Sequence, residues 1–278
     1  MSPSDTARGS GGRRASPQPT ARSVERTVEI DAPLGAVWRA LTDADELTRW
    51  FPLEARVEPG AGGSIWMRWS DVYGGLSRIE VWEPEAHLRI AFPTDGPGPV
   101  ATDYYLQGRS GRTVLRVVSS GFGAGVGWDD FYDGVRRGWA FELTALRHYL
   151  ERHHGEDRVV AWVRVPYAFA DAEAWRRLTG PGGWLGADGL DHIGPGSRYQ
   201  ARTVTGTDLV GSVHAWQPPM LFAGTVEGLR EALLRLELER WGETRYVNLW
   251  LATYGVPAAD VGALESAWRS SLAEALEA

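Results

Sequence analysis

Histidine and the carboxylates are the side chains of this sequence that could perform acid–base or metal chemistry, because cysteine and lysine are both absent. Without cysteine the chain has no thiol nucleophile, no disulfide and no thiolate metal ligand. Without lysine it has no amine for a Schiff base and no P-loop lysine. Several classes of enzyme are therefore excluded before any motif is considered.

Three histidines gather near the end of a predicted helix, at His148, His153 and His154. A metal site on one helix face needs imidazoles four residues apart, and these separations of five, six and one do not provide it. A solvated helix end is expected instead. His87 follows a turn, where exposure is usual, and His192 lies in a Gly-rich loop without neighbouring ligands. We therefore predict no metal site, no triad and no catalytic residue.

Asp129, Asp130 and Asp133 occupy the first turns of the same helix, where carboxylates normally balance the partial positive charge of a helix start. The glycines of residues 123–127 precede them, but their spacing is not G-x-G-x-x-G and no lysine follows. A flexible connector is expected rather than a nucleotide site, and no cofactor is predicted.

Aromatic side chains offer a different chemistry, that of an apolar pocket. The chain has fourteen tryptophans, and core packing explains those that recur in both halves, such as Trp139 and Trp268. Trp66, Trp69 and Trp128 have no aromatic counterpart in the second half. The candidate pocket residues are Trp66, Trp69, Tyr104, Tyr105, Trp128 and Tyr132.

The elements that would position these residues are a long helix and a sheet. Over residues 127–154, apolar side chains recur at spacings of three and four, which predicts an amphipathic helix. Upstream, a strand with alternating polarity begins at Val24, two short helices follow Pro33, and several strands separated by Gly/Pro turns run to Ser120. Residues 1–22 are polar and are expected to be disordered.

This order of elements is that of the helix-grip fold, and several motifs resemble the START-like (SRPBCC) superfamily. They are most similar to bacterial homologues of the activator of the heat-shock protein 90 ATPase. The motifs are Ile30-Asp31-Ala32-Pro33, residues 37–43, Trp50-Phe51, Pro59-Gly60 through Gly62-Gly63, and Gly138-Trp139. The resemblance implies a cavity between a curved sheet and the long helix, usually for a hydrophobic small molecule. It does not imply a single activity.

The same pattern returns in the second half. Residues 175–179 repeat residues 38–42, the turn at 194–197 repeats the turn ending at Ser64, and residues 213–218 repeat residues 79–84. A tandem duplication is predicted, with an α+β fold of two helix-grip domains at 23–154 and 158–278. Matching the copies predicts that Ile79 and Val81, like Val213 and Ala215, face the helix. Residues 180–196 are Gly-rich and predict a loop in place of the second small helix.

Charge and hydropathy limit the partners. The net charge is −7, and four arginines against one aspartate give the first 22 residues +3, which leaves about −10 for the remainder. Such a chain is not expected to bind nucleic acid. No run approaches the roughly 18 apolar residues of a membrane span. Arg13-Arg14 is not followed by the apolar stretch of an export signal, so a cytoplasmic protein is expected.

The favoured interpretation is a protein whose first domain binds a small hydrophobic or aromatic molecule, while the second domain chiefly supports it. One alternative is an interaction module of the co-chaperone kind, with a chaperone or another protein as partner. The other is an enzyme similar to polyketide cyclases and aromatases. The sequence names no ligand and leaves open whether any reaction is catalysed.

Overall fold

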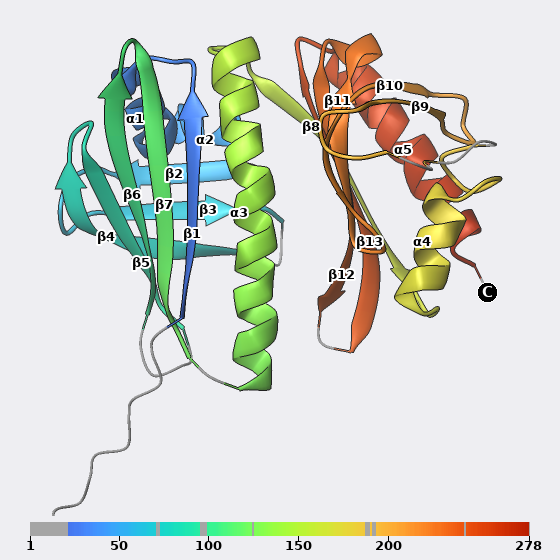
Figure 1. Cartoon of the computed structure of the whole chain (residues 1–278), viewed down its shortest axis with the longest axis horizontal. Helices are drawn as coiled ribbons and strands as arrows, with labels where there is room; N and C mark the ends of the chain where they lie inside the picture. Colours follow the sequence, from blue (N-terminus) through green and yellow to red (C-terminus); the bar gives the residue numbers. More distant parts are fainter. Residues whose placement is uncertain are drawn as a thin grey trace, which may run out of the picture.

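The computed structural model describes residues 22–70, 73–94, 99–123, 125–186, 190, 193–241 and 243–277. Residues 1–21 and His192 lie outside the described residues, so the expectations for them stay predictions. The described residues form two antiparallel sheets, each followed by a long helix (Figure 1). The predicted α+β class is confirmed.

The first unit starts with β1 (Arg22–Ile30) and the short helices α1 (Leu34–Thr42) and α2 (Ala44–Thr48). Six strands and the long helix follow: β2 (Glu54–Glu58), β3 (Ser64–Arg68), β4 (Gly74–Glu83), β5 (His87–Phe92), β6 (Val100–Arg109), β7 (Arg112–Phe122) and α3 (Val126–Arg152). The strand order in the sheet is β1-β7-β6-β5-β4-β3-β2. The meander is therefore closed by the first strand, and Trp139 and Leu146 of α3 pack into its core.

The second unit repeats this order with one strand fewer. Its elements are β8 (Arg158–Tyr167), α4 (Asp171–Thr179), β9 (Arg198–Arg202), β10 (Asp208–Gln217), β11 (Leu221–Val226), the 3-10 turn η1 (Glu227–Leu229), β12 (Ala232–Trp241), β13 (Thr244–Tyr254) and α5 (Ala258–Ala275). The sheet order β8-β13-β12-β11-β10-β9 matches that of the first sheet without a counterpart of β2.

Equivalent contacts recur in the two units. Trp38 of α1 meets Trp82 of β4 with ring centroids 5.2 Å apart, and Trp175 of α4 meets Trp216 of β10 at 5.5 Å. The last threonine of each small helix donates a hydrogen bond to the carbonyl of that tryptophan, at 2.7 Å in α1 and 3.0 Å in α4. Both the topology and these details support the predicted tandem duplication.

The described residues of the Gly-rich stretch after α4 form no helix, and Trp184, Leu185 and Leu190 from it pack into the core of the second unit. Trp184 from this loop is 1% exposed, donates from Nε1 to Ser271 Oγ of α5 at 2.9 Å, and lies edge-on to Trp268. In the first unit the same position in the chain order, after the first small helix, is taken by α2. The two copies therefore close their interiors by different means.

The predicted inward faces of β4 and β10 are correct only as far as a bulge. Ile79 and Val213 are buried in their cores, but the pairing register shifts directly after each of them. Beyond the shift Trp82 and Trp216 face the cores, whereas Ala215 packs on the opposite side of the second sheet. The prediction for Val81 and Ala215 was wrong because one extra residue in a strand reverses the side-chain alternation.

α3 lies between the two sheets (Figure 1). Trp139, Leu143 and Leu146 face the first core, while Phe141 and Ala145 pack against Ala223, Leu233 and Ala252 from the outer face of the second sheet. We call this second contact the seam. None of the helices formed by the described residues has the length and apolar character needed to cross a membrane.

The seam yields a prediction about stability. Phe141→Ala should lower the free energy of unfolding by about 3–5 kcal/mol, because Phe141 is 5% exposed and its loss leaves a cavity between helix and sheet. Phe131→Ala on the same helix is the matched control, since Phe131 is 38% exposed. Urea denaturation measures both, and equal losses for the two variants would contradict a packed seam.

Candidate functional site

The interior of the first unit contains a small hollow between the sheet and the two short helices. Its volume is about 10 Å³, enough for roughly one water molecule. Its walls come from α1, α2, the turn after α2, and strands β3, β5 and β6. The lining residues are Leu41, Leu47, Trp50, Phe51, Ile65, Met67, Leu88, Ile90 and Tyr104. The hollow is therefore a small apolar gap inside the first unit, bounded on one side by the sheet and on the other by the short helices.

Tyr104 is the one lining residue with a hydroxyl. Its side chain is 4% exposed, and burial raises the pKa of its phenol, which therefore stays neutral at physiological pH. The hydroxyl makes no hydrogen bond to a described residue, while its ring meets Trp139 edge-on at 5.7 Å. A phenol that makes no hydrogen bond to the described residues can bond a polar group placed beside it.

A short polar chain fixes α3 over this wall. Trp139 Nε1 donates to Ser119 Oγ at 2.9 Å, and Ser119 Oγ lies 2.9 Å from Thr102 Oγ1. Ser119 is 1% exposed, so these groups satisfy one another away from water. Their role is to position Trp139 and, through it, the ring of Tyr104.

The six aromatic candidates from the sequence do not form one site. Tyr104 lines the hollow, and Trp69 lies next to it with its ring 5.0 Å from that of Phe51. Trp66 and Tyr105 lie on the opposite face of the sheet, where Arg56 covers Trp66 and Tyr105 stacks on His87. Trp128 and Tyr132 lie in the first turns of α3, with Tyr132 against Phe122.

Strand alternation explains this division. Ile65 and Met67 are buried on the core side of β3, so Trp66 between them points the other way. The same rule separates Tyr104 from Tyr105 on β6. The alternation was a signal in the sequence that could have identified Ile65 and Met67 as lining residues. Leu47 lies in α2, and Trp50 and Phe51 lie in the turn after it; they were missed because helical spacing and the Trp50-Phe51 motif do not show which side chains line a hollow.

His87 is more enclosed than expected. Its Nε2 lies 2.7 Å from Asp103 Oδ1, and Arg89 forms ion pairs with both Asp103 and Glu80. The ring of Tyr105 covers the imidazole, with centroids 4.3 Å apart. No hydroxyl or other nucleophile is bonded to His87 among the described residues, so this cluster stabilises the outer face of the first sheet.

The expectation of a solvated helix end was wrong for His148 and His153. They are 8% and 5% exposed, because the outer face of the second sheet covers the last turns of α3. His148 Nε2 lies 2.7 Å from the carbonyl oxygen of Glu231, and its ring is 5.1 Å from that of His153 and 6.5 Å from that of His214. The described residues contain no group of three or more possible ligands that could hold a metal ion.

Burial beside the seam lowers the pKa values of the histidines and raises that of Glu142. It lowers the pKa of His148 to about 4, and it also lowers the pKa values of His153 and His214. It raises the pKa of Glu142 to about 7, against the attraction of Arg235, whose Nη1 lies 3.3 Å from Glu142 Oε1. Loss of hydration is the main cause in each case.

Comparisons with known proteins agree with the fold of the first unit. Residues 31–151, less than half of the chain, match the family described as activator of Hsp90 ATPase homolog 1-like protein. The resemblance seen in the sequence is therefore confirmed for this stretch. No curated protein matches the sequence.

Three solved structures illustrate the similarity. CalU16 from Micromonospora echinospora is 25% identical over 50% of this chain and 80% of that chain, with a TM-score of 0.40. The Aha1 dimer from Colwellia psychrerythraea is 20% identical over 48% and 99%, with a TM-score of 0.44. The di-domain ARO/CYC BexL from the BE-7585A biosynthetic pathway is 16% identical over 92% and 99%, with a TM-score of 0.42.

The seam should make stability depend on pH. His148 has a folded-state pKa below its ordinary value, so the stability it contributes is complete above about pH 6.5 and is lost as the pH falls toward 4. For His148→Gln, the difference in unfolding free energy from the parent should therefore change by about 2 kcal/mol between pH 7 and pH 5. Urea denaturation at several pH values measures this difference, in which most other titrations cancel.

Glu142→Gln should change the pH dependence of the unfolding free energy in the opposite direction. Because the folded-state pKa of Glu142 is raised, its ionisation destabilises the fold above about pH 7 and this cost disappears as the pH falls toward 4.5. The unfolding free energy of the variant relative to that of the parent should be highest above pH 7, and this difference should fall on acidification. If the unfolding free energies of both variants differ from that of the parent by a constant amount at every pH, neither side chain has the shifted pKa given above.

Proposed function

We propose that the first unit binds a small hydrophobic or aromatic molecule between its sheet and its helices, with Tyr104 as the polar contact. One observation carries this proposal: the hollow has apolar walls, and Tyr104, its one lining residue with a hydroxyl, makes no hydrogen bond to a described residue. Apolar walls with few, well-placed polar groups are the usual composition of small-molecule sites.

The hollow is far smaller than the few hundred Å³ that such sites occupy when filled. Binding therefore requires wall side chains to move. Met67 has an unbranched side chain that adapts easily to a new shape, and Phe51 lies in a turn rather than in the sheet. We propose that residues 23–154 contain the site and that residues 158–278 support it, because Trp184 fills the interior of the second unit.

A second candidate is an interaction module whose surface binds another protein. It is favoured by the nearly filled interior and by the family match, whose description names an activator of a chaperone ATPase. Copurification with the chaperone from the same cells, followed by an ATPase assay at micromolar concentrations, tests this candidate. Unchanged turnover of the chaperone counts against it.

A cyclase-like activity finds less support, because the residues that line the hollow include no histidine and no carboxylate. Tyr104 is the single lining residue that could transfer a proton, and its raised pKa makes it a poor acid or base at neutral pH. We therefore propose binding rather than a reaction.

The role of Tyr104 can be tested with two probes of equal shape. Tyr104→Phe should weaken the binding of 2-naphthol about threefold to tenfold, the effect of one neutral hydrogen bond, and leave the binding of naphthalene nearly unchanged. Quenching of tryptophan fluorescence measures both affinities, since Trp50 and Trp139 lie beside the hollow.

Tyr105→Phe is the matched control, because the neighbouring residue lies on the other face of the sheet and should change neither affinity. If neither probe binds the parent protein, and solvent extraction of freshly purified protein yields no bound small molecule by mass spectrometry, the proposed function is wrong.

A further inference from the structure

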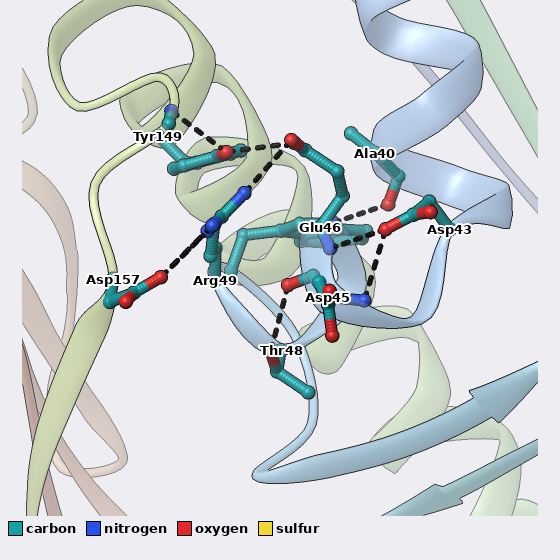
Figure 2. A network of polar contacts seen from close by, with 10 residues as sticks. Ala40, Asp43, Asp45, Glu46, Thr48, Arg49, Tyr149 and Asp157 are labelled. Atoms are coloured by element: carbon teal, nitrogen blue, oxygen red, sulfur yellow. Dashed lines mark hydrogen bonds and ion pairs between the residues drawn. The ribbon is translucent and has the colours of Figure 1, made fainter.

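The segment Ala44–Pro52, which comprises α2 and the turn after it, forms one wall of the hollow through Leu47, Trp50 and Phe51. We call it the wall segment. Figure 2 shows those of its polar contacts that involve Asp43, Glu46, Arg49, Tyr149 and Asp157. Asp43 Oδ1 accepts from the backbone N–H groups of Asp45 and Glu46, both at 3.0 Å, and so caps the start of α2. Contacts from its own unit thus hold the beginning of the wall segment.

The end of the wall segment is held from both units. Within the first unit Trp50 Nε1 donates to the carbonyl oxygen of Ala40 at 2.8 Å, and the second unit supplies further donors. A helix leaves its last carbonyl groups without partners within the helix. Here the hydroxyl of Tyr254 donates to the carbonyl oxygen of Arg49 at 2.7 Å. Arg158 Nη2 donates to the carbonyl oxygens of Phe51, at 3.3 Å, and of Pro52.

These two donors belong to one place in the second unit. Arg158 begins β8 and Tyr254 ends β13, and the two residues are direct partners in the antiparallel ladder of those strands. Tyr254 is 2% exposed and packs into the hydrophobic core of the first unit, although it belongs to the second. The end of the second sheet therefore reaches the first unit and binds three backbone carbonyl oxygens within Arg49–Pro52.

The joint between the units adds to these contacts (Figure 2). Arg49 Nη2 forms an ion pair with Asp157 at 3.0 Å, and Arg49 Nη1 forms one with Glu46 at 3.0 Å. The hydroxyl of Tyr149 donates to Glu46 Oε2 at 2.8 Å and accepts from the backbone N–H of Gly155 at 3.0 Å. The wall segment, the end of α3 and the joint thus share one network.

The opposite wall of the hollow cannot move in the same way, because Ile65, Leu88 and Tyr104 belong to strands whose backbone groups are paired on both sides. Beyond the space that side chains such as Met67 can yield by changing shape, the hollow can grow only if a helical wall withdraws. Withdrawal of the wall segment breaks the bonds from Tyr254 and Arg158. We infer that the second unit is a latch on the ligand site of the first: its sheet end holds the wall segment closed and sets the rate at which a ligand enters. The consequence for ligands rests on the proposed function, whereas the latch itself does not.

Hydrogen–deuterium exchange of the full-length protein tests the latch without a ligand. In Tyr254→Phe and in Arg158→Gln, amides of residues 46–53 should exchange about threefold to tenfold faster than in the parent, as expected for the loss of one or two hydrogen bonds. Exchange in β6 and β7 should stay unchanged. Tyr246→Phe is the matched control, since Tyr246 lies on the same strand with its ring over Arg164, away from the wall segment.

The same variants should raise the association rate constant of 1-anilinonaphthalene-8-sulfonate by a similar factor, measured by stopped-flow fluorescence. Unchanged exchange at residues 46–53 in both variants, or an equal rise throughout the first sheet, overturns the latch. Faster exchange at these residues supports the latch even if the probe binds none of the proteins, and that absence of binding would overturn the proposed function instead.

Discussion

The burial of α3 on two opposite sides is the constraint on which the rest of this structure depends. One side of the helix carries Trp139 and Leu146 into the first core, and the other carries Phe141 and Ala145 into the seam. Residues between these stripes are also withdrawn from water, among them Glu142 and His148. Their charged forms lose hydration, which is why the carboxyl has a raised pKa and the imidazole a lowered one.

The same constraint explains why the two copies differ on their outer faces. On the first sheet this face carries Glu25, Arg116 and Asp103 and meets solvent or ion partners. On the second sheet it carries Ala223 and Ala252, whose small side chains let α3 approach closely. The two copies therefore share one architecture but differ on their outer faces. The outer face of the first sheet meets solvent, whereas that of the second sheet packs against α3.

Most of the fold could be predicted from the sequence, because helix and strand periods are local properties of the chain. The long helix, the meander and the second copy followed from spacing alone, and strand alternation could also have separated Tyr104 from Tyr105. The bulges after Ile79 and Val213 could not be predicted, since one extra residue leaves no mark in composition. The burial of His148 could not be predicted either, because the surface that covers it lies about 80 residues away in sequence, at Glu231.

The candidate site was the least predictable part, because its lining residues are separated in sequence and its wall segment is also held by the second copy. Leu47, Trp50 and Phe51 look like ordinary core residues of a short helix, and Tyr254 looks like the end of a strand in another unit. In the structure the ring of Tyr254 stacks on that of His153 at 4.2 Å while its hydroxyl holds the carbonyl of Arg49. Tyr254 thereby contacts both the buried His153 and the wall segment of the hollow. Burial lowers the pKa of His153, so its protonation costs free energy in the folded state and acidification destabilises the packing beside Tyr254.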